Sequence, residues 1–342
     1  MARIIESLQR KKQNLPEPHL HLVPSIVWDG RRWRAIWNTV HYRPLDETFH
    51  EFIIYRVLLP TFGEDWRKEQ MTLPKTDRHI LIRWVESYSE WKKLHQQENN
   101  KEAENRWSAA PSGEVLALHQ FAYDAYCLQT INRLPDFLVH KLKNVKEFQG
   151  ARYEVAVAAV IARAGYEITF LDEQIKSEKH CEFIAKNKYS GEEIGVEAKS
   201  RRRMGVIHEK GESDPEDLVK GDVGRLFRKA CAQRPNNMPY LIFIDLNVMP
   251  TPGIPTEKKP WVDDVKAMLV RWGEPSSDNP EPFNALVLTN FSYYYAGNAG
   301  DAPRGEYVLI VSQYPQFPSR GSGALGEIWE GLERYSHIPH EV

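Results

Sequence analysis

The sequence predicts a mixed α/β protein whose N-terminal part is mainly helical and contains a β-hairpin. Two observations support this fold class. From Gly150 onward, an apolar helical segment, three short strands, a second helix and a buried strand follow one another along the chain. Before Gly150, strand-like alternation is confined to residues 25–37, and longer stretches show helical spacing of apolar residues. We expect the later strands to form a mixed sheet that is flanked by helices.

The N-terminal domain is expected to span residues 1–112, and seven of the ten tryptophans lie in it. Within it, the Asp-Gly pair of the hairpin at 25–37 suits the positive φ angles of a tight turn. A helix is predicted over residues 47–59, ending at Pro60, and a longer one begins after Asp77. A polar linker is predicted over residues 96–112. The tryptophans are most simply core residues, with a protein-binding surface as the second choice.

The second domain is expected to span residues 113–342, with its core at 145–250. The apolar periodicity and the glycine and proline positions predict helices at 114–133, 136–143, 153–162, 216–233, 261–272 and 325–335. Short β-branched and aromatic runs predict strands at 166–171, 180–187, 194–201, 240–244, 285–288 and 307–311.

Composition excludes several classes of protein. The formal net charge is −2 over 342 residues, so any polyanionic partner must meet a local basic patch. The three cysteines, Cys127, Cys181 and Cys231, lie far apart, which indicates neither a zinc site nor a disulfide framework and suits a reducing cytoplasm. No apolar run approaches the roughly 18 residues that span a bilayer, and the first residues lack the apolar stretch of a signal peptide. We therefore expect a cytoplasmic protein without a membrane partner.

The residues that could carry chemistry lie on two neighbouring predicted strands and the helix before them. Side chains alternate along a strand, so Glu197 and Lys199 share one face. A hairpin would bring Glu182 alongside Glu197, and Glu154 lies on the preceding helix. Three carboxylates and a lysine that converge suit a hard divalent cation such as Mg²⁺, which takes oxygen ligands.

This pattern resembles the PD-(D/E)xK nuclease superfamily, which has the restriction-endonuclease-like fold. Glu197-Ala198-Lys199 matches its E-x-K element, and Glu182 stands where the family has a metal-binding aspartate. Asp172 is the nearest substitute for Glu182. The segment from Gly150 to Glu154 is similar to the family's first-helix element, and the order of helix, three-strand meander, helix and strand also agrees. The likeness covers roughly residues 145–250.

The resemblance implies roles for these side chains. Glu182 and Glu197 would bind Mg²⁺, with Mn²⁺ as a substitute, Lys199 would position the attacking water, and Glu154 would assist as a further metal ligand. A simpler interpretation remains open, because Glu and Lys alternate on many solvent-facing strands and form surface ion pairs there. Glu154 has its own alternative, since the helix dipole favours a glutamate in a first helical turn by about 0.3–1 kcal/mol.

Basic residues follow the E-x-K element and could neutralise phosphates without reading bases. They are Arg201, Arg202, Arg203, Arg225, Arg228 and Lys229. A solvated face, interleaved with acidic residues, explains them equally well.

The leading expectation is a Mg²⁺-dependent endonuclease that hydrolyses DNA phosphodiester bonds, and the resemblance implies a role in restriction, repair or anti-phage defence. The first alternative is a catalytically inactive protein of the same fold that serves as a nucleic-acid-binding or assembly module. A nuclease that acts on RNA is the weaker alternative. DNA is the expected partner; a protein bound by the N-terminal region and a second copy of the chain in a homodimer are left open.

Overall fold

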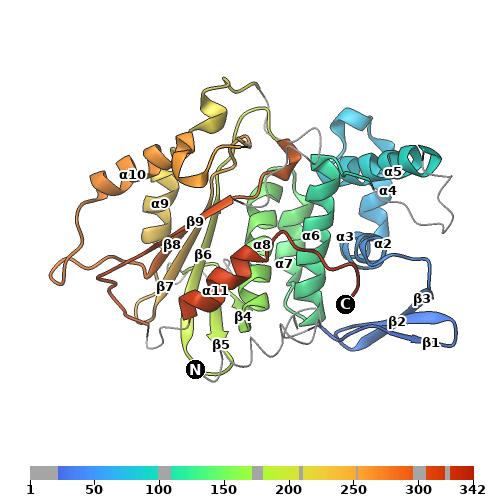
Figure 1. Cartoon of the computed structure of the whole chain (residues 1–342), viewed down its shortest axis with the longest axis horizontal. Coiled ribbons are helices and arrows are strands. Elements are labelled where there is room, and N and C mark those ends of the chain that lie inside the picture. Colours follow the sequence, from blue (N-terminus) through green and yellow to red (C-terminus); the bar gives the residue numbers. More distant parts are fainter. Residues whose placement is uncertain are drawn as a thin grey trace.

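The computed structural model describes residues 22–98, 109–171, 180–207, 211–251, 253–295, 306–319 and 324–342. These residues form a mixed α/β structure in which a six-stranded sheet lies between two layers of helices (Figure 1). A three-stranded antiparallel sheet lies apart from it, beside the helical N-terminal part. The mixed α/β class with helices on both faces of the large sheet is therefore confirmed. No described helix is long and apolar enough to cross a membrane.

All six strands predicted for the second part are present. They are β4 (Tyr166–Phe170), β5 (Phe183–Asn187), β6 (Glu193–Ser200), β7 (Tyr240–Asp245), β8 (Ala285–Asn290) and β9 (Glu306–Val311). Their spatial order follows the sequence, with β4, β5 and β6 as an antiparallel meander. Strands β6, β7 and β8 are parallel, and β9 returns antiparallel. Every residue of β7 and β8 is buried, as expected for strands covered on both faces.

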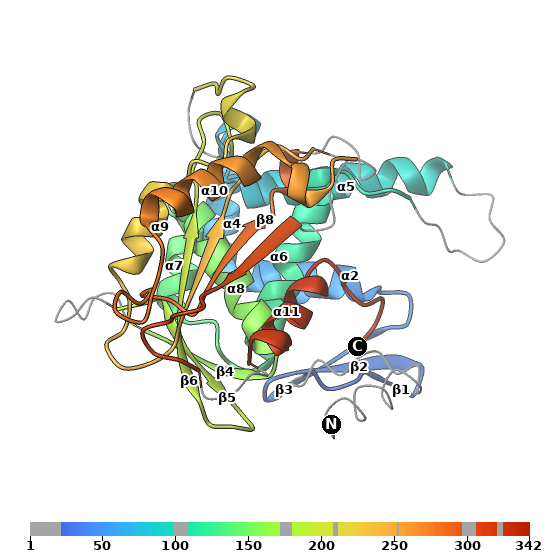
Figure 2. The ribbon, with the colours of Figure 1, turned by 60° about the vertical axis from the view of Figure 1, so that its left-hand side comes forward.

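Successive side chains along β6 and β7 point to opposite faces of the sheet, so they belong to two separate hydrophobic cores. Val196 and Ala198 belong to one hydrophobic cluster with the helix at Phe148–Arg163, termed α8. Ile242 and Ile244 belong to a second cluster, on the opposite face of the sheet. The second cluster includes side chains of α9 (Gly224–Cys231) and α10 (Pro260–Trp272), which cover this face in Figure 2.

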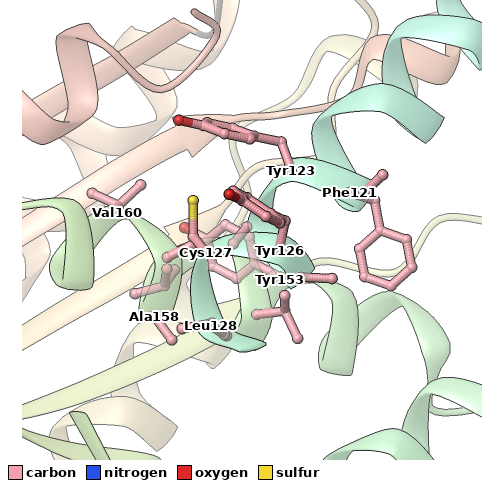
Figure 3. Packing of buried hydrophobic residues seen from close by; sticks show 14 of the residues in the cluster. Phe121, Tyr123, Tyr126, Cys127, Leu128, Tyr153, Ala158 and Val160 are labelled. Atoms are coloured by element: carbon pink, nitrogen blue, oxygen red, sulfur yellow. The ribbon is translucent and has the colours of Figure 1, made fainter. Parts of the chain in front are cut away.

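The first cluster is built around two long helices that pack against each other. Helix α6 (Gly113–Thr130) contacts α8, and Figure 3 shows their side chains meeting, with Tyr123, Tyr126 and Cys127 on α6 and Ala158 and Val160 on α8. The other helices of this layer are α7 (Asp136–Lys143) and α11 (Ala324–Glu333). The predicted helices of this region are thus present, and α8 begins several residues before the predicted start.

The small sheet contains the predicted hairpin and one strand that was not predicted. Strands β1 (Ile26–Trp28) and β2 (Arg31–Ile36) are joined at Asp29 and Gly30, with φ angles of 51° and 68°. Strand β3 (Thr39–Pro44) pairs with β2 through a second turn. Trp37 lies in that turn with φ of 52°, so it does not continue the alternating face of β2.

The helix predicted over residues 47–59 continues past Pro60. It consists of α2 (Phe49–Phe52), the π-helix η1 (Ile53–Leu58) and α3 (Leu59–Phe62). Pro60 lies in the first turn of α3, where its missing N–H is tolerated, and the π-helix has already changed the hydrogen-bond register. The segment ends at Gly63, whose φ is 77°.

The rest of the N-terminal part is helical, and its core is continuous with that of the second part. Its further elements are α4 (Glu64–Thr72), the 3₁₀ turn η2 (Lys75–Asp77) and α5 (Ile80–Glu98). Trp84 of α5 is fully buried and lies against Phe148 of α8, with ring centroids 5.9 Å apart. Trp28 and Trp37, in contrast, are 65% and 58% exposed, so the tryptophans are not uniformly core residues. Most of the linker predicted at 96–112 lies outside the described residues.

The helix predicted over residues 216–233 is only partly formed. The 3₁₀ turn η3 (Asp217–Val219) is followed by α9, which begins at Gly224. The Asp217 carbonyl accepts the Lys220 N–H at 3.4 Å within the 3₁₀ turn, and the carbonyl groups of Asp217 and Lys220 both accept hydrogen bonds from Arg203. Gly221 also lies so close to Trp261 that an added Cβ would be 2.5 Å from the Trp261 carbonyl oxygen. Two further 3₁₀ turns are η4 (Thr256–Lys258) and η5 (Tyr293–Tyr295).

Candidate functional site

The central strand β6 carries Glu197 and Lys199 on one face. In the parallel register with β7, Glu197 is opposite Ile242 and Lys199 is opposite Ile244, so both side chains belong to the face covered by α9 and α10. Glu197 is fully buried, whereas the Lys199 side chain is 20% exposed. The pair therefore does not lie on a solvent-facing strand, which removes the main argument for an idle surface ion pair.

Glu182 joins this pair from the chain segment that leads into β5. Its backbone N–H donates to the Val196 carbonyl at 3.1 Å, and its own carbonyl accepts from the Leu171 N–H at 3.0 Å. These two bonds hold Glu182 between β4 and β6, at the point where the regular strand begins. Lys199 Nζ donates to Glu182 Oε1 at 2.9 Å and also makes an ion pair with Glu197 Oε1. The structure thus brings together Glu182, Glu197 and Lys199.

Burial and like charge make this group electrostatically unusual. Burial, and then repulsion by the Glu182 carboxylate, raise the pKa of Glu197 well above its ordinary value, although Lys199 opposes the shift. For Lys199, burial acts downward, but the two carboxylates outweigh it and raise the lysine pKa. The ammonium group is therefore charged over the physiological pH range, and it is held between two acidic side chains.

The donor set fits a divalent cation that prefers oxygen ligands. Both carboxylate oxygens of Glu197 are buried, and neither accepts a hydrogen bond of regular geometry from the described residues. Lys199 supplies one positive charge to two carboxylates, and a bound cation would neutralise the charge that remains. Mg²⁺ binds through one or two carboxylates and completes its shell with water and substrate phosphate. Glu182 and Glu197 could supply those two carboxylates.

Glu154 does not join this group, which corrects the expectation that three carboxylates converge. It lies on α8, which packs against Val196 and Ala198, the face of the sheet opposite to Glu197. Its Oε2 makes an ion pair with Lys141 Nζ at 3.5 Å. No group of three His, Cys, Asp or Glu residues placed to hold a metal occurs in the described part of the chain. Asp172, the substitute for Glu182, lies outside the described residues.

A buried polar network that was not predicted supports the carboxyl end of β6 from the α8 side. Asp245, at the end of β7, accepts hydrogen bonds from the Phe291 N–H at 3.0 Å and the Ser200 hydroxyl at 3.3 Å. Arg152 Nη2 lies 3.9 Å from Asp245 Oδ2. Gln149 Nε2 donates to Ser200 Oγ and to the Arg201 carbonyl. These contacts fix the strand directly after Lys199. An acidic residue at the strand end was visible in the sequence, but its distant partners were not.

The first three basic residues after Lys199 have different surroundings. Arg201 makes an ion pair with Asp222, and Arg202 is exposed. Arg203 is buried, and its guanidinium donates to the carbonyl groups of Asn247, Leu246, Asp217 and Lys220. Arg203 therefore fastens the following loop to the end of β7. Its assignment as a nucleic-acid contact is wrong, because the side chain is enclosed by protein carbonyls.

Helix α9 presents the other three basic residues to solvent. Arg225, Arg228 and Lys229 are all exposed, while Phe227 and Cys231 point into the second cluster. The helix packs on the sheet face that carries Glu197 and Lys199. A polyanion on α9 would therefore lie on the same side of the sheet as the carboxylate group.

No family model, no curated protein and no solved structure matches the chain.

Proposed function

We propose that the protein is a divalent-metal-dependent nuclease that hydrolyses DNA phosphodiester bonds. The observation that carries the proposal is the group formed by Glu182, Glu197 and Lys199. Two buried carboxylates share one lysine on a central strand, and exposed arginines lie on the helix that covers the same face. An enclosed charged group of this kind is more typical of a functional site than of a structural ion pair.

The order of elements supports a restriction-endonuclease-like fold. Helix α8, the antiparallel meander β4–β6, helix α9 and the parallel strand β7 follow the arrangement that the resemblance implies. The meander places Glu182 beside Glu197, which is the juxtaposition that the E-x-K pattern requires. Strands β8 and β9 extend the sheet beyond this arrangement.

Each side chain has a role that follows from its position. Glu182 and Glu197 would hold Mg²⁺ or Mn²⁺, which supplies charge neutralisation and Lewis acidity at the phosphate when bound. Lys199 is charged and partly exposed, so it can donate a hydrogen bond to an attacking water and stabilise negative charge that develops on the phosphate. Glu154 is left without a catalytic role.

The experiment is cleavage of a plasmid and of matched single-stranded DNA and RNA, with Mg²⁺ and with chelator. We expect Mg²⁺-dependent cleavage of DNA that is reduced by at least about 100-fold in Lys199→Ala and in Glu197→Gln. Lys186→Ala is the matched control, because Lys186 pairs with Glu193 on the exposed part of the same hairpin. Cleavage that persists in both site variants would contradict the proposal. Preferential cleavage of RNA would show that RNA, rather than DNA, is the substrate.

A second candidate is a non-catalytic nucleic-acid-binding module. The position of Glu154 favours it, because Glu154 pairs with Lys141 and, among the described residues, Glu182 and Glu197 are the two carboxylates beside Lys199. Such a module would bind DNA without Mn²⁺ binding at Glu182 and Glu197. Metal titration therefore separates the two candidates.

A further inference from the structure

Helices α9 and α10 enclose a cleft on the side of the sheet that carries the carboxylate group. The two helices lie side by side in Figures 1 and 2. The cleft has a volume of about 530 Å³, and three arginines and one tryptophan contribute to its lining: Arg225, Arg228, Arg271 and Trp272. A volume of this size accommodates a group as large as a nucleotide.

The acidic residues of the cleft are already engaged. Asp222 makes an ion pair with Arg201, and Asp264 Oδ2 accepts the Gly221 N–H at 2.8 Å. Arg225, Arg228 and Arg271 are exposed, and none makes an ion pair with another described residue. The cleft therefore presents three guanidinium groups that have no ion-pair partner among the described residues, and guanidinium groups form bidentate hydrogen bonds with phosphate.

Trp272 adds a second kind of contact. Its side chain is 39% exposed at the end of α10 and meets the Phe227 ring edge-on, with centroids 4.8 Å apart. Phe227 is buried, so it holds the indole at the cleft while part of the indole faces solvent. An exposed ring beside phosphate-binding cations is the combination that binds an unpaired base and its backbone.

The cleft is connected to the carboxylate group through a short chain of contacts. Arg201 follows Lys199 by two residues and makes an ion pair with Asp222, which lines the cleft. A strand whose scissile phosphate lies at Lys199 would thus have its neighbouring nucleotides near α9.

We propose that this cleft binds a single-stranded or locally unpaired segment of nucleic acid, with its phosphates on Arg225, Arg228 and Arg271 and one base stacked on Trp272. The inference rests on the proposed function for its substrate class, but it concerns binding alone. Arg271 and Trp272 come from α10, and they extend the basic surface of α9 into a site with a defined shape.

The test is equilibrium binding of fluorescein-labelled oligothymidylate of roughly a dozen nucleotides to the full chain, in chelator, over a series of salt concentrations. For a single strand, the slope of log affinity against log salt falls by about 0.7 for each phosphate contact that is lost. We expect Arg271→Gln and Arg228→Gln each to show this decrease in slope. Lys266→Gln is the matched control, because Lys266 is exposed on α10 but does not line the cleft. Arginine variants that behave like Lys266→Gln would overturn the proposal.

Stacking is tested with the same strand and with an abasic strand of equal length. Trp272→Leu should weaken binding of the oligothymidylate by about 5- to 150-fold and leave binding of the abasic strand unchanged. Equal effects on both strands would refute the stacking contact. Because binding is measured without metal, the two proposals fail separately. Arginine-dependent binding without cleavage would contradict only the nuclease, and cleavage with unaltered binding in the arginine variants would contradict only the cleft.

Discussion

Replacement of Lys199 by methionine should convert a compensated group into two buried carboxylates that repel each other. Lys199 Nζ lies 2.9 Å from Glu182 Oε1 and also contacts Glu197, which is fully buried. Removal of one partner from a buried ion pair destabilises a protein by about 3–5 kcal/mol. Methionine retains most of the length and apolar volume of the lysine side chain, so packing changes little.

Lys186→Met provides the matched control on the same hairpin. Lys186 Nζ lies 3.5 Å from Glu193 Oε1, and both side chains are about half exposed. Exposed pairs contribute about 0–1 kcal/mol, so the two variants should differ in free energy of unfolding by at least about 2 kcal/mol. The assay is urea unfolding followed by circular dichroism.

The pH dependence gives an independent check on the same variant. Without Lys199, the pKa of Glu197 rises further above its unfolded value, so the folded state binds the proton more tightly. The destabilisation of Lys199→Met should therefore be small near pH 4 and should grow as pH rises above the ordinary carboxyl range. Added Mn²⁺ should restore part of the lost stability at about pH 8, because a ligand that binds only the folded state stabilises it. If Lys199→Met is as stable as Lys186→Met at every pH, then Lys199 does not compensate the charges of Glu182 and Glu197.

Two further predictions concern buried residues outside this group. Burial raises the pKa of Asp124 to about 7, against the opposing effect of Arg163. Because this folded value exceeds the unfolded one, the wild type should lose up to about 4 kcal/mol between roughly pH 4 and pH 7. Asp124→Asn should remove that slope in urea unfolding, and an unchanged slope would contradict the assignment. Arg203→Met should lower the free energy of unfolding by at least about 2 kcal/mol, because the carbonyl groups of the buried Leu246 and Asn247 lose a donor. The folded Arg203→Met protein should bind oligothymidylate as tightly as the wild type does. A loss of binding by the folded variant would show that Arg203 contacts nucleic acid.

Local signals in the sequence were sufficient to predict most of the second part and the first hairpin of the N-terminal part. The apolar runs of β7 and β8 and the Asp29-Gly30 turn each specify a structure within a few residues. The juxtaposition of Glu182 and Glu197 also follows from local information, because the two lie on either side of one hairpin. Strand β3 was missed because its exposed residues alternate weakly, with Val40 and Tyr42 more than half exposed.

Long-range contacts explain what the sequence could not predict. Glu154 was expected beside the other two carboxylates because it lies on the helix that precedes them in the sequence. In the structure it makes an ion pair with Lys141 on α7 instead. Arg203 was grouped with its neighbours by charge, although carbonyl groups of residues more than 40 positions away enclose it. The continuation of the helix past Pro60 depends on a π-helical turn, which leaves no simple sequence signal. The cleft between α9 and α10 likewise depends on a tertiary packing, which places Arg228 and Arg271 on the lining of one cleft.

Mn²⁺ binding at the carboxylate group tests the central claim most directly. Isothermal titration calorimetry of the full chain with Mn²⁺ should show binding that is lost in Glu197→Gln, since that substitution removes a buried oxygen ligand and its charge. Glu154→Gln should bind Mn²⁺ as the wild type does, because Glu154 lies on the other side of the sheet and pairs with Lys141. Wild-type protein that binds no Mn²⁺, or binding that survives in Glu197→Gln, would contradict the proposed metal-dependent nuclease.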